Sequence, residues 1–487
     1  GLNKLIVYYD ANDAQISGKV SRSDSVNYAT VFEGLGWNVQ EIDGHDHSAM
    51  HFAIETAKVM DKPSIIIGKT IMAKGTVNME GDHNTHGAPL PQDEIDLTKQ
   101  SLGLPNKNFY VPSEVIEHFS YRFSDLNNES NNWKKMYKEY NNNSELKDLI
   151  TNTIAGKIIS EFDIPDFNSG DILATRKAFG AVLDSIAKDL PQLVGGSADL
   201  EPSNYTGNFA EMYGDFKKTN KSGRNIPFGV REFPMAAIMN GMALHGGIIP
   251  FGGTFLVFSD YEKPALRLAA IQKVRVIHEF THDSFYVGED GPTHQPIEHI
   301  MSLRAIPDFK VYRPADAKET ASCMKLAIKD KTTPSALLLT RQGVPILGGT
   351  QNQNEANVSK GAYAVIDCEG NPEIILLATG SEVSLAIEVA NKLEGKKIRV
   401  ISMPCWEIFN VQTDEYKKAL IPERGNLKVS IEAGITNGWE KYIGSNGLAI
   451  GIDHFGSSAP ASDLASEFGF TADQVINKIE KYLKSLL

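Results

Sequence analysis

Short apolar runs without polar alternation recur along this chain, and they constrain its fold more than any other feature. The first two are Leu5–Tyr9 and Ser64–Gly68, and later examples are EIILLATG, KIRVISMP, LKVSIEA and LAIGID. Continuous apolar strands are typical of parallel sheets that are covered on both faces, so we expect Leu5–Tyr9 to be fully buried. Segments with helical periodicity, such as 48–60 and 171–188, separate many of the runs. The pattern predicts an α/β fold of mainly parallel sheets flanked by helices.

Two polar segments interrupt the alternation and divide the chain into three blocks. Residues 92–165 are polar and helical in pattern, and we expect a solvated helical linker with breaks at NNESNNW (127–133) and NNNSEL (141–146). GVPILGGTQNQNEAN is a second, turn-rich linker. A chain of 487 residues also favours about three domains, at roughly 100 to 200 residues each. We therefore expect domains at 1–165, 166–350 and 351–487.

The composition excludes several classes of protein. A net charge of −13 argues against a general affinity for nucleic acid or for an anionic membrane. Cys323, Cys368 and Cys405 are far apart and fit neither a disulfide framework nor a metal site, which favours a reducing cytoplasm. No signal peptide is evident, and no apolar run approaches the roughly 18 residues of a membrane-spanning helix.

Polar clusters that directly follow apolar strands are candidate sites, because ligands bind at the carboxyl ends of strands in open parallel sheets. The first such cluster is Asp10-Ala11-Asn12. The amide oxygen of Asn12 suits a hard cation such as Mg²⁺ beside a phosphate. A simple turn is the alternative, and the spacing alone favours the turn.

Two further clusters, GDHNTHGAP and SADLEPSN, each leave two interpretations open. His83 and His86 have no evident third partner, so zinc is not expected there, but a glycine-flanked histidine could hydrogen-bond a substrate or a diphosphate. Asp199 and Ser203 suit helix caps or turns as well as they suit ligand binding.

Glu232 lies in the segment FGVREFPMAAIMNGMALHGG, between Arg231 and a stretch of apolar residues. Apolar neighbours favour a neutral carboxyl that can donate a proton. Arg231 and the N-terminus of a helix both favour the charged form instead. From these residues alone, a helix-terminal glutamate paired with Arg231 is slightly the better interpretation.

The densest polar cluster is THDSFYVGEDGPTHQP, which follows a buried strand. A structural loop does not require so many titratable groups, so the cluster favours a functional role. Its titratable residues are His282, Asp283, Glu289, Asp290 and His294.

Two smaller sets of residues could complete a site. Arg176 in ATRK and Arg341 in LTRQ could each bind a phosphate in a bidentate manner, although a surface ion pair is the alternative for either. Phe255, Phe258 and Tyr261 are three residues apart, so a helix or tight turn places them on one face. That face either packs into the core or forms an aromatic wall for a flat heterocycle.

Taken together and in this order, the motifs resemble the transketolase family of thiamine-diphosphate enzymes over essentially the whole chain. The motifs are THGAPL, GGSADLEPSN, FGVREF, THDS-x-x-VGEDGPTHQP, LTRQ and ATGSEV. THGAPL and SADLxPSN are specific to transketolases and close relatives, whereas DGPTHQ is shared more widely among thiamine enzymes. The resemblance implies a diphosphate-binding domain with its helical linker, a pyrimidine-binding domain and a transketolase C-terminal domain. It also implies a homodimer that binds the cofactor between its subunits.

The activity implied by the resemblance is a reversible transfer of a two-carbon ketol unit through a thiamine-diphosphate enamine. The donor is a ketose phosphate such as xylulose 5-phosphate, the acceptor is an aldose phosphate, and the pathway is the pentose phosphate pathway. Mg²⁺ or Ca²⁺ accompanies the cofactor.

The resemblance further assigns roles to individual residues. Glu232 hydrogen-bonds the aminopyrimidine ring as the catalytic carboxyl, and His86 and His294 face the reacting carbons. The implied cofactor-binding residues are Asn12, His86, Asp199, Glu232, Phe255, Phe258 and Tyr261. The implied substrate-binding residues are His86, Arg176, Ser203, His282, Asp290 and Arg341. The implied metal ligands are Asn12 and the backbone carbonyl of Ala14.

One departure from the family pattern leaves two alternatives open. The family's metal motif begins with Gly-Asp-Gly, and this segment is absent from the sequence, together with upstream histidines and glycines that contact substrate and diphosphate. The first alternative is a non-catalytic portion of a transketolase that does not hold the cofactor. The second is a relative of dihydroxyacetone synthase.

Overall fold

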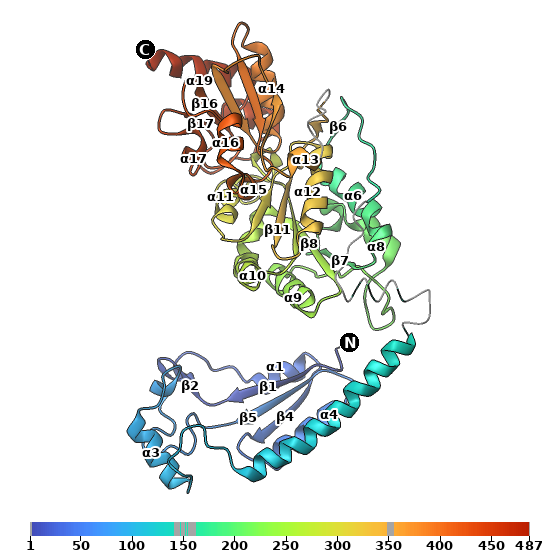
Figure 1. The fold of residues 1–487 in the computed structure, drawn as a ribbon, viewed down its shortest axis with the longest axis vertical. Coiled ribbons are helices and arrows are strands. Elements are labelled where there is room, and N and C mark those ends of the chain that lie inside the picture. Colours follow the sequence, from blue (N-terminus) through green and yellow to red (C-terminus); the bar gives the residue numbers. More distant parts are fainter. Residues whose placement is uncertain are drawn as a thin grey trace. The chain divides into compact units, whose positions relative to one another are not determined.

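The computed structural model consists of two compact units, Gly1–Asn142 and Asn143–Leu487, which are drawn as ribbons in Figure 1. The residues that it describes are 2–140, 147, 151, 153, 162–347 and 355–486. The expected break at NNNSEL (141–146) and the expected boundary at 350/351 lie outside these residues.

A three-stranded parallel sheet in the order β1-β5-β4 forms the centre of the first unit. The strands of this unit are β1 (Ile6–Ala11), β2 (Ala14–Gln15), β3 (Gly18–Lys19), β4 (Asn38–Asp43) and β5 (Ser64–Lys69), with β2 and β3 forming an antiparallel pair. The central strand β5 is buried from Ser64 to Gly68. The expectation that Leu5–Tyr9 is fully buried is wrong. β1 is an edge strand of this sheet. Tyr8 and Asp10, which lie on the same face of β1, are exposed, and Tyr8 is 40% exposed.

Helices follow the strands of the first unit in sequence. They are α1 (Tyr28–Gly34), α2 (His47–Val59), α3 (Gln92–Ser101) and α4 (Ser113–Tyr140), with two 3₁₀ helices, η1 (Val20–Arg22) and η2 (His83–Thr85). The expected amphipathic helix at 48–60 is confirmed as α2. Its start is defined by Asp46, whose carboxylate accepts hydrogen bonds from the backbone N–H groups of Ser48 and Ala49.

Helix α4 is continuous through the segment NNESNNW, so the break expected there is wrong. Asparagine is only a moderately poor helix former, and the segment contains neither glycine nor proline. The rings of Trp133 and Tyr137, one helical turn apart, stack with centroids 5.2 Å apart just after the segment. No residue of α4 is buried, as expected for a solvated helix.

The second unit contains a five-stranded parallel sheet in the order β10-β11-β9-β8-β7. Its strands are β7 (Leu193–Ser197), β8 (Ile249–Phe255), β9 (Ile277–Thr281), β10 (Lys310–Tyr312) and β11 (Ser335–Leu339). A short antiparallel pair, β6 (Ile172–Leu173) and β12 (Val344–Pro345), joins the two ends of this region. The helices are α6 (Thr175–Asp189), α7 (Glu201–Asn204), α8 (Gly207–Tyr213), η3 (Leu256–Phe258), α9 (Glu232–His245), α10 (Ser259–Gln272), η4 (Phe285–Val287), α11 (His299–Arg304) and α12 (Ala317–Lys329).

A further five-stranded sheet, in the order β13-β15-β14-β16-β17, completes the second unit. Its strands are β13 (Tyr363–Ile366), β14 (Ile374–Ala378), β15 (Ile398–Ser402), β16 (Leu427–Ile431) and β17 (Leu448–Ile450). The helices are α13 (Glu355–Val358), α14 (Glu382–Lys392), α15 (Trp406–Asn410), α16 (Asp414–Leu420), α17 (Glu440–Ile443), α18 (Ala461–Glu467) and α19 (Ala472–Ser485). Only β13 is antiparallel to its neighbour, and our sequence analysis did not anticipate it.

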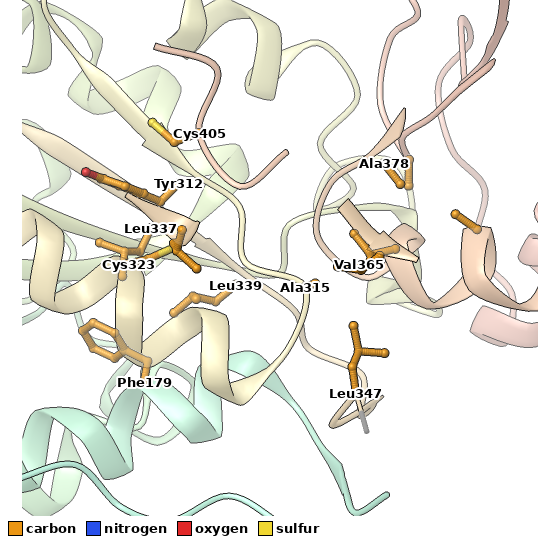
Figure 2. Packing of buried hydrophobic residues seen from close by; sticks show 14 of the residues in the cluster. Phe179, Tyr312, Ala315, Cys323, Leu337, Leu339, Leu347, Val365, Ala378 and Cys405 are labelled. Carbon is orange, nitrogen blue, oxygen red and sulfur yellow. The ribbon is translucent and has the colours of Figure 1, made fainter. Parts of the chain in front are cut away.

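One apolar core runs through both sheets of the second unit. Figure 2 shows Phe179 of α6 and Cys323 of α12 beside Leu337 and Leu339 of β11, and the same cluster continues to residues such as Ala378 of β14. These side chains are all 0% exposed. Because fully burying one large apolar side chain contributes roughly 1.5–3 kcal/mol, the shared core fixes the two sheets as one compact unit.

The three cysteines, for which no disulfide framework was expected, are free thiols, and Cys323 and Cys405 are buried. None of the helices in the described ranges has the length and apolar character needed to cross a bilayer.

Candidate active site

The carboxyl ends of three neighbouring strands bring most of the expected residues of the second unit to one edge of the sheet. β7, β8 and β9 are adjacent and parallel, so their ends lie side by side. Asp199 follows β7, Phe255 ends β8 and His282 follows β9. This is the edge at which an open parallel sheet binds its ligands.

Aromatic and imidazole rings form a continuous cluster at this edge. The rings of Phe255 and Phe258 stack with centroids 5.7 Å apart, and Tyr261 continues the row 6.1 Å from Phe258. The ring of His282 lies 3.8 Å from Phe255, and that of His294 lies 5.8 Å from Phe258. Phe255 is only 9% exposed whereas Tyr261 is 64% exposed, so the row runs from the core to the surface. The three aromatic side chains therefore serve both as packing and as an open ring surface.

Two residues at this edge adopt a backbone conformation that is costly for anything but glycine. Asp199 has φ 63° and His282 has φ 62°, both in the left-handed region. Such positions cost about 1–3 kcal/mol each and persist where the surrounding structure enforces them, often at functional sites. Asp199 lies two residues after β7, and His282 directly follows β9.

Asn204 enforces this arrangement, and our sequence analysis did not single it out. Its side-chain Nδ2 donates to the carbonyl of Thr254 and to Oγ1 of Thr281, each at 3.2 Å. Its Oδ1 accepts a hydrogen bond from Oγ of Ser197 at 2.7 Å. One buried amide thus ties together the ends of β7, β8 and β9. The available signal was its place at the end of the SADLEPSN motif.

His282 is a buried, neutral imidazole. It is 4% exposed, and its Nδ1 lies 2.8 Å from Oγ1 of Thr281. Burial lowers its pKa to about 3, and the positive charges of Arg176 and Arg341 add to this shift. The neutral ring can therefore offer one nitrogen to a ligand at physiological pH.

Arg176 and Arg341 form no ion pair within the part of the chain that the structure describes, so the surface ion-pair interpretation does not hold there. Nη1 of Arg176 donates to the backbone carbonyl of Ser203 at 3.0 Å, and its guanidinium lies 5.3 Å from the ring centroid of Tyr205. Arg341 is exposed just after β11. Two guanidinium groups near His282 without carboxylate partners make a local positive site in an acidic chain.

Glu232 is the first residue of α9 and is half-buried. Arg231 is turned away from it, because Nη1 of Arg231 donates to the carbonyl of Phe228 at 3.2 Å, and in the described chain no ion pair joins the two residues. The expected pairing with Arg231 is therefore wrong. Glu232 instead lies near a fully buried pair in which Nδ1 of His278 is 3.0 Å from Oε2 of Glu262.

The loop THDSFYVGEDGPTHQP is held by buried polar contacts. The carboxylate of Asp283 accepts a hydrogen bond from Nε of Arg313 at 2.9 Å, and both side chains are almost completely buried. Nε2 of Gln295 donates to the carbonyls of Gly288 and Ser457 at 2.8 and 2.9 Å. Asp283 and Gln295 are thus structural, while Asp290 is left exposed on the loop.

Comparison with known proteins decides the family. Three family models match in succession: "Transketolase, thiamine diphosphate binding domain" over residues 1–158, "Transketolase, pyrimidine binding domain" over 171–346, and "Transketolase-like TK C-terminal domain" over 361–471. The transketolase of Staphylococcus aureus (strain MRSA252) is 43% identical over 98% of this chain and 73% of its own length. The transketolase of Geobacillus stearothermophilus is 43% identical over 99% of this chain and 73% of its own.

The chain belongs to the transketolase family.

Solved transketolase structures share the fold of this family member. A transketolase from Leishmania mexicana superimposes with a TM-score of 0.94 at 38% identity, covering 99% of this chain and 72% of that one. A transketolase from Campylobacter jejuni gives 0.89 at 38% identity, covering 99% and 73%. The predicted α/β class with mainly parallel sheets is confirmed, as is a transferase that uses thiamine diphosphate.

The first unit of this transketolase carries Asn12, Ala14 and His86. Oδ1 of Asn12 accepts a hydrogen bond from the backbone N–H of Ala14 at 3.0 Å, which is the turn that the spacing favoured. An amide oxygen has two acceptor sites, so this turn leaves room for a cation. His86 is exposed at the end of η2, where its backbone N–H donates to the carbonyl of His83. The structure places Asn12 and Ala14 in one tight loop after β1.

Within the described ranges, one group of His, Asp and Glu side chains has ligand atoms close enough for a metal ion. Asp260, Glu298 and His299 each offer an atom within 4.8 Å of the others, but both carboxylates are exposed, and Nε2 of His299 already contacts Asp260 at 3.1 Å. Exposed acidic side chains around one bonded histidine do not define a metal site. The sequence pattern did not suggest this group.

Glu262, His278 and Glu279 are wholly buried titratable residues of the pyrimidine-binding region that the sequence analysis also missed. Glu279 lacks a hydrogen bond on either carboxylate oxygen among the described residues. The only sequence signal was a His-Glu dipeptide inside an otherwise apolar strand.

Proposed function

We propose that this transketolase-family chain catalyses the reversible transfer of a two-carbon ketol unit from a ketose phosphate, such as xylulose 5-phosphate, to an aldose phosphate. The observation that carries the proposal is the single sheet edge on which an aromatic row, a neutral buried His282 and the unpaired Arg176 lie together. A sugar phosphate needs this combination of a cationic end and polar groups along its hydroxyls.

The residues present fit the pyrimidine half of thiamine diphosphate. The row of Phe255, Phe258 and Tyr261 opens from the core to a 64% exposed ring, and it offers a stacking surface for a flat heterocycle. When bound, thiamine diphosphate supplies a nucleophilic carbon and an electron sink for the two-carbon unit. Glu232 is proposed to hydrogen-bond the aminopyrimidine and to share a proton with it, and Asp199 is proposed to line the same pocket.

The remaining residues are proposed to handle the sugar phosphate. Arg176, Arg341, Ser203 and His282 bind the phosphate end, since the guanidinium groups supply charge and the neutral imidazole supplies a hydrogen-bonding nitrogen. Asp290 accepts from a substrate hydroxyl. His294 and His86 face the reacting carbons, where they move protons to or from substrate oxygens, and His86 also contacts the diphosphate.

A divalent cation, Mg²⁺ or Ca²⁺, is proposed at Asn12 and the carbonyl of Ala14. Two protein oxygens are fewer than the six or more that such ions take, and these ions commonly complete their shells with water and phosphate oxygens. The turn that holds Asn12 over Ala14 supports this assignment, because it keeps both groups in one loop.

We further propose a cytoplasmic homodimer, acting in the pentose phosphate pathway, with domains at 1–165, 166–350 and 351–487. The packed pair of helices α9 and α10 supports the dimer, because it exposes many apolar side chains. They are Phe233 (45% exposed), Ile238 (48%), Leu244 (56%), Tyr261 (64%), Leu268 (46%) and Ile271 (58%). Exposed apolar surface of this kind marks an interaction face. Active sites at the subunit interface would combine the first unit of one chain with the second unit of its partner.

The decisive experiment is a coupled assay of the 487-residue chain with thiamine diphosphate and Mg²⁺. Turnover of xylulose 5-phosphate with ribose 5-phosphate supports the proposal, and turnover only with formaldehyde as acceptor identifies a dihydroxyacetone-synthase-like enzyme. Glu232→Ala should abolish turnover and leave the fold intact. Glu415→Ala, which removes a first-turn helix glutamate from α16, is the matched control and should retain activity. Near-normal activity of Glu232→Ala would contradict the role assigned to this carboxyl.

A further inference from the structure

Glu279 occupies an unusual position for a carboxyl group. It lies in the middle of β9, between β8 and β11 of the parallel sheet, and is 0% exposed. Neither of its carboxylate oxygens has a hydrogen-bond partner among the described residues. A buried polar group without partners is costly, so its neighbours should explain what it does.

The space for this carboxyl is provided by a glycine. Gly253 of β8 pairs with Glu279, and a Cβ at Gly253 would come within 2.7 Å of Oε2 of Glu279. Asn204 lines the same space, but its amide is already bonded to Ser197, Thr254 and Thr281. The side chain of Glu279 therefore points towards α7, on the side of the sheet opposite to the His278–Glu262 pair.

Arg176 is the charged group that acts on Glu279 in this compartment. Its electrostatic attraction opposes the effect of burial on Glu279. Nε of Arg176 is itself buried without a hydrogen-bond partner, while Nη1 is held by the carbonyl of Ser203. A buried carboxyl and a partly buried guanidinium thus lie near each other, and among the described residues no ion pair joins them. The other titratable groups around Arg176 are Tyr205, Arg341 and the neutral His282, which in turn lies near His294.

We propose that Glu279 is a positioning residue for the anion site at Arg176: its neutral form leaves the guanidinium free for a substrate phosphate, and its ionised form draws the guanidinium inwards and weakens phosphate binding. The inference rests on the proposed function, because it takes Arg176 as part of the sugar-phosphate site.

The proton balance follows from linkage. Burial raises the pKa of Glu279 well above its ordinary value, so the neutral form persists above the ordinary carboxyl range and is lost as the pH rises further. A dianionic phosphate at Arg176 adds negative charge nearby and favours the neutral form further. Phosphate binding under alkaline conditions is therefore coupled to the uptake of one proton from the buffer by Glu279, and by reciprocity alkaline pH weakens phosphate binding.

The test compares ribose 5-phosphate binding to the wild-type chain and to Glu279→Gln by isothermal titration calorimetry, with thiamine diphosphate and Mg²⁺ present and no ketose donor. The phosphate group is fully dianionic above pH 7.5, since its second pKa is about 6. Between pH 7.5 and 9.5, the wild-type dissociation constant should rise at least about fivefold, the lower end of typical site-to-site couplings. That of Glu279→Gln should stay constant. Titration in two buffers of different ionisation enthalpy should show proton uptake in the wild type and none in the variant.

Matched controls separate the possible outcomes. Unphosphorylated ribose should show no such pH dependence with either protein. Glu262→Gln removes a buried carboxyl on the opposite face of the sheet and should retain the wild-type pH dependence. Equal pH dependence in the wild type and Glu279→Gln would overturn the role of Glu279 and leave the proposed function standing. If the wild type bound ribose 5-phosphate no better than ribose, both proposals would fall.

Discussion

The second unit contains two groups of buried charges that differ in how completely they are hydrogen-bonded. The first, the Arg313 network, consists of Arg313, Asp283, Glu382, Glu432 and Arg304. Arg304 makes a bidentate pair with Glu432 at 2.8 and 2.9 Å, and Arg313 donates to Asp283, to both oxygens of Thr379 and to Glu382. The second group, Glu279 with the His278–Glu262 pair, has almost no hydrogen bonds.

The comparison separates structural charges from charges that are available for chemistry. In the Arg313 network, burial opposes the charge on Arg313, but Glu382 and Asp283 outweigh this effect and raise its pKa. The network joins the THDS loop to the ATGSEV segment of the next sheet. In the second group, burial is the largest effect and raises the pKa values of Glu262 and Glu279, against the opposing effects of His278 and Arg176. The Arg313 network is therefore structural, whereas Glu262 and Glu279 are buried carboxyls with raised pKa values.

The largest effect is expected from breaking the Arg313 network. Arg313→Met fills a similar volume but leaves Asp283 and Glu382 buried without their counter-charge. We expect a loss of about 3–5 kcal/mol in the free energy of unfolding, as is usual when one partner of a buried pair is removed. Urea denaturation followed by tryptophan fluorescence measures this loss. A loss below about 1 kcal/mol would show that the network does not stabilise the loop.

The next effect concerns His282, which is adjacent in sequence to Asp283 but faces the candidate site. Its folded-state pKa of about 3 lies below the unfolded value of 6.5, so the unfolded chain binds the proton first as the pH falls. Stability should decline below pH 6.5. At pH 5 this histidine should lower the free energy of unfolding by about 2 kcal/mol, since each pH unit below 6.5 costs about 1.36 kcal/mol. The measurement is the change in unfolding free energy between pH 7.5 and pH 5 for the wild type, compared with His282→Asn. The variant should lose about 2 kcal/mol less than the wild type, and equal losses would contradict the depressed pKa.

A gain in stability is expected when Glu279 is replaced. Its folded-state pKa is raised, so the wild type is destabilised progressively as the pH rises above the ordinary carboxyl range. Glu279→Met keeps the length of the side chain and removes the unbonded carboxyl, and we expect a gain of about 1–2 kcal/mol at pH 7.5. Chemical denaturation at pH 6 and pH 8.5 should show a larger gain at the higher pH. A net loss at both values would place an unseen partner on this carboxyl.

The smallest effect is expected at a solvent-exposed pair, which calibrates the others. Lys392 contacts Glu388 at 3.0 Å and Asp473 at 3.1 Å, with about half of the lysine side chain exposed. Lys392→Ala should change the free energy of unfolding by less than about 1 kcal/mol, and added salt should reduce even that difference. A larger change would mean that the changes in unfolding free energy predicted for Arg313, His282 and Glu279 do not depend on their burial.

Much of the fold could be predicted from the sequence because strand and helix patterns are local. The run Ser64–Gly68 became the buried strand β5, and the helical segment 171–188 corresponds to α6. The expectations of a helix break at NNESNNW and of a fully buried first strand were wrong, because breaks and burial depend on contacts with other parts of the chain. NNESNNW is continuous helix in α4, and β1 has an open face. His282 was singled out because its polar cluster follows an apolar strand.

The sequence by itself determined the α/β class, the alternation of strands and helices along the chain and the polar clusters that follow strands. Only the tertiary structure decided which members of those clusters are structural and which face the site. His282 and Asp283 are neighbours in the chain, yet one is a neutral ring beside Phe255 and the other is bonded to Arg313. The space for the Glu279 side chain comes from Gly253 and the nearby positive charge comes from Arg176, and both residues lie on other elements. The physical reason is that hydrogen-bond partners and burial, which set the charge of each group, come from residues distant in sequence.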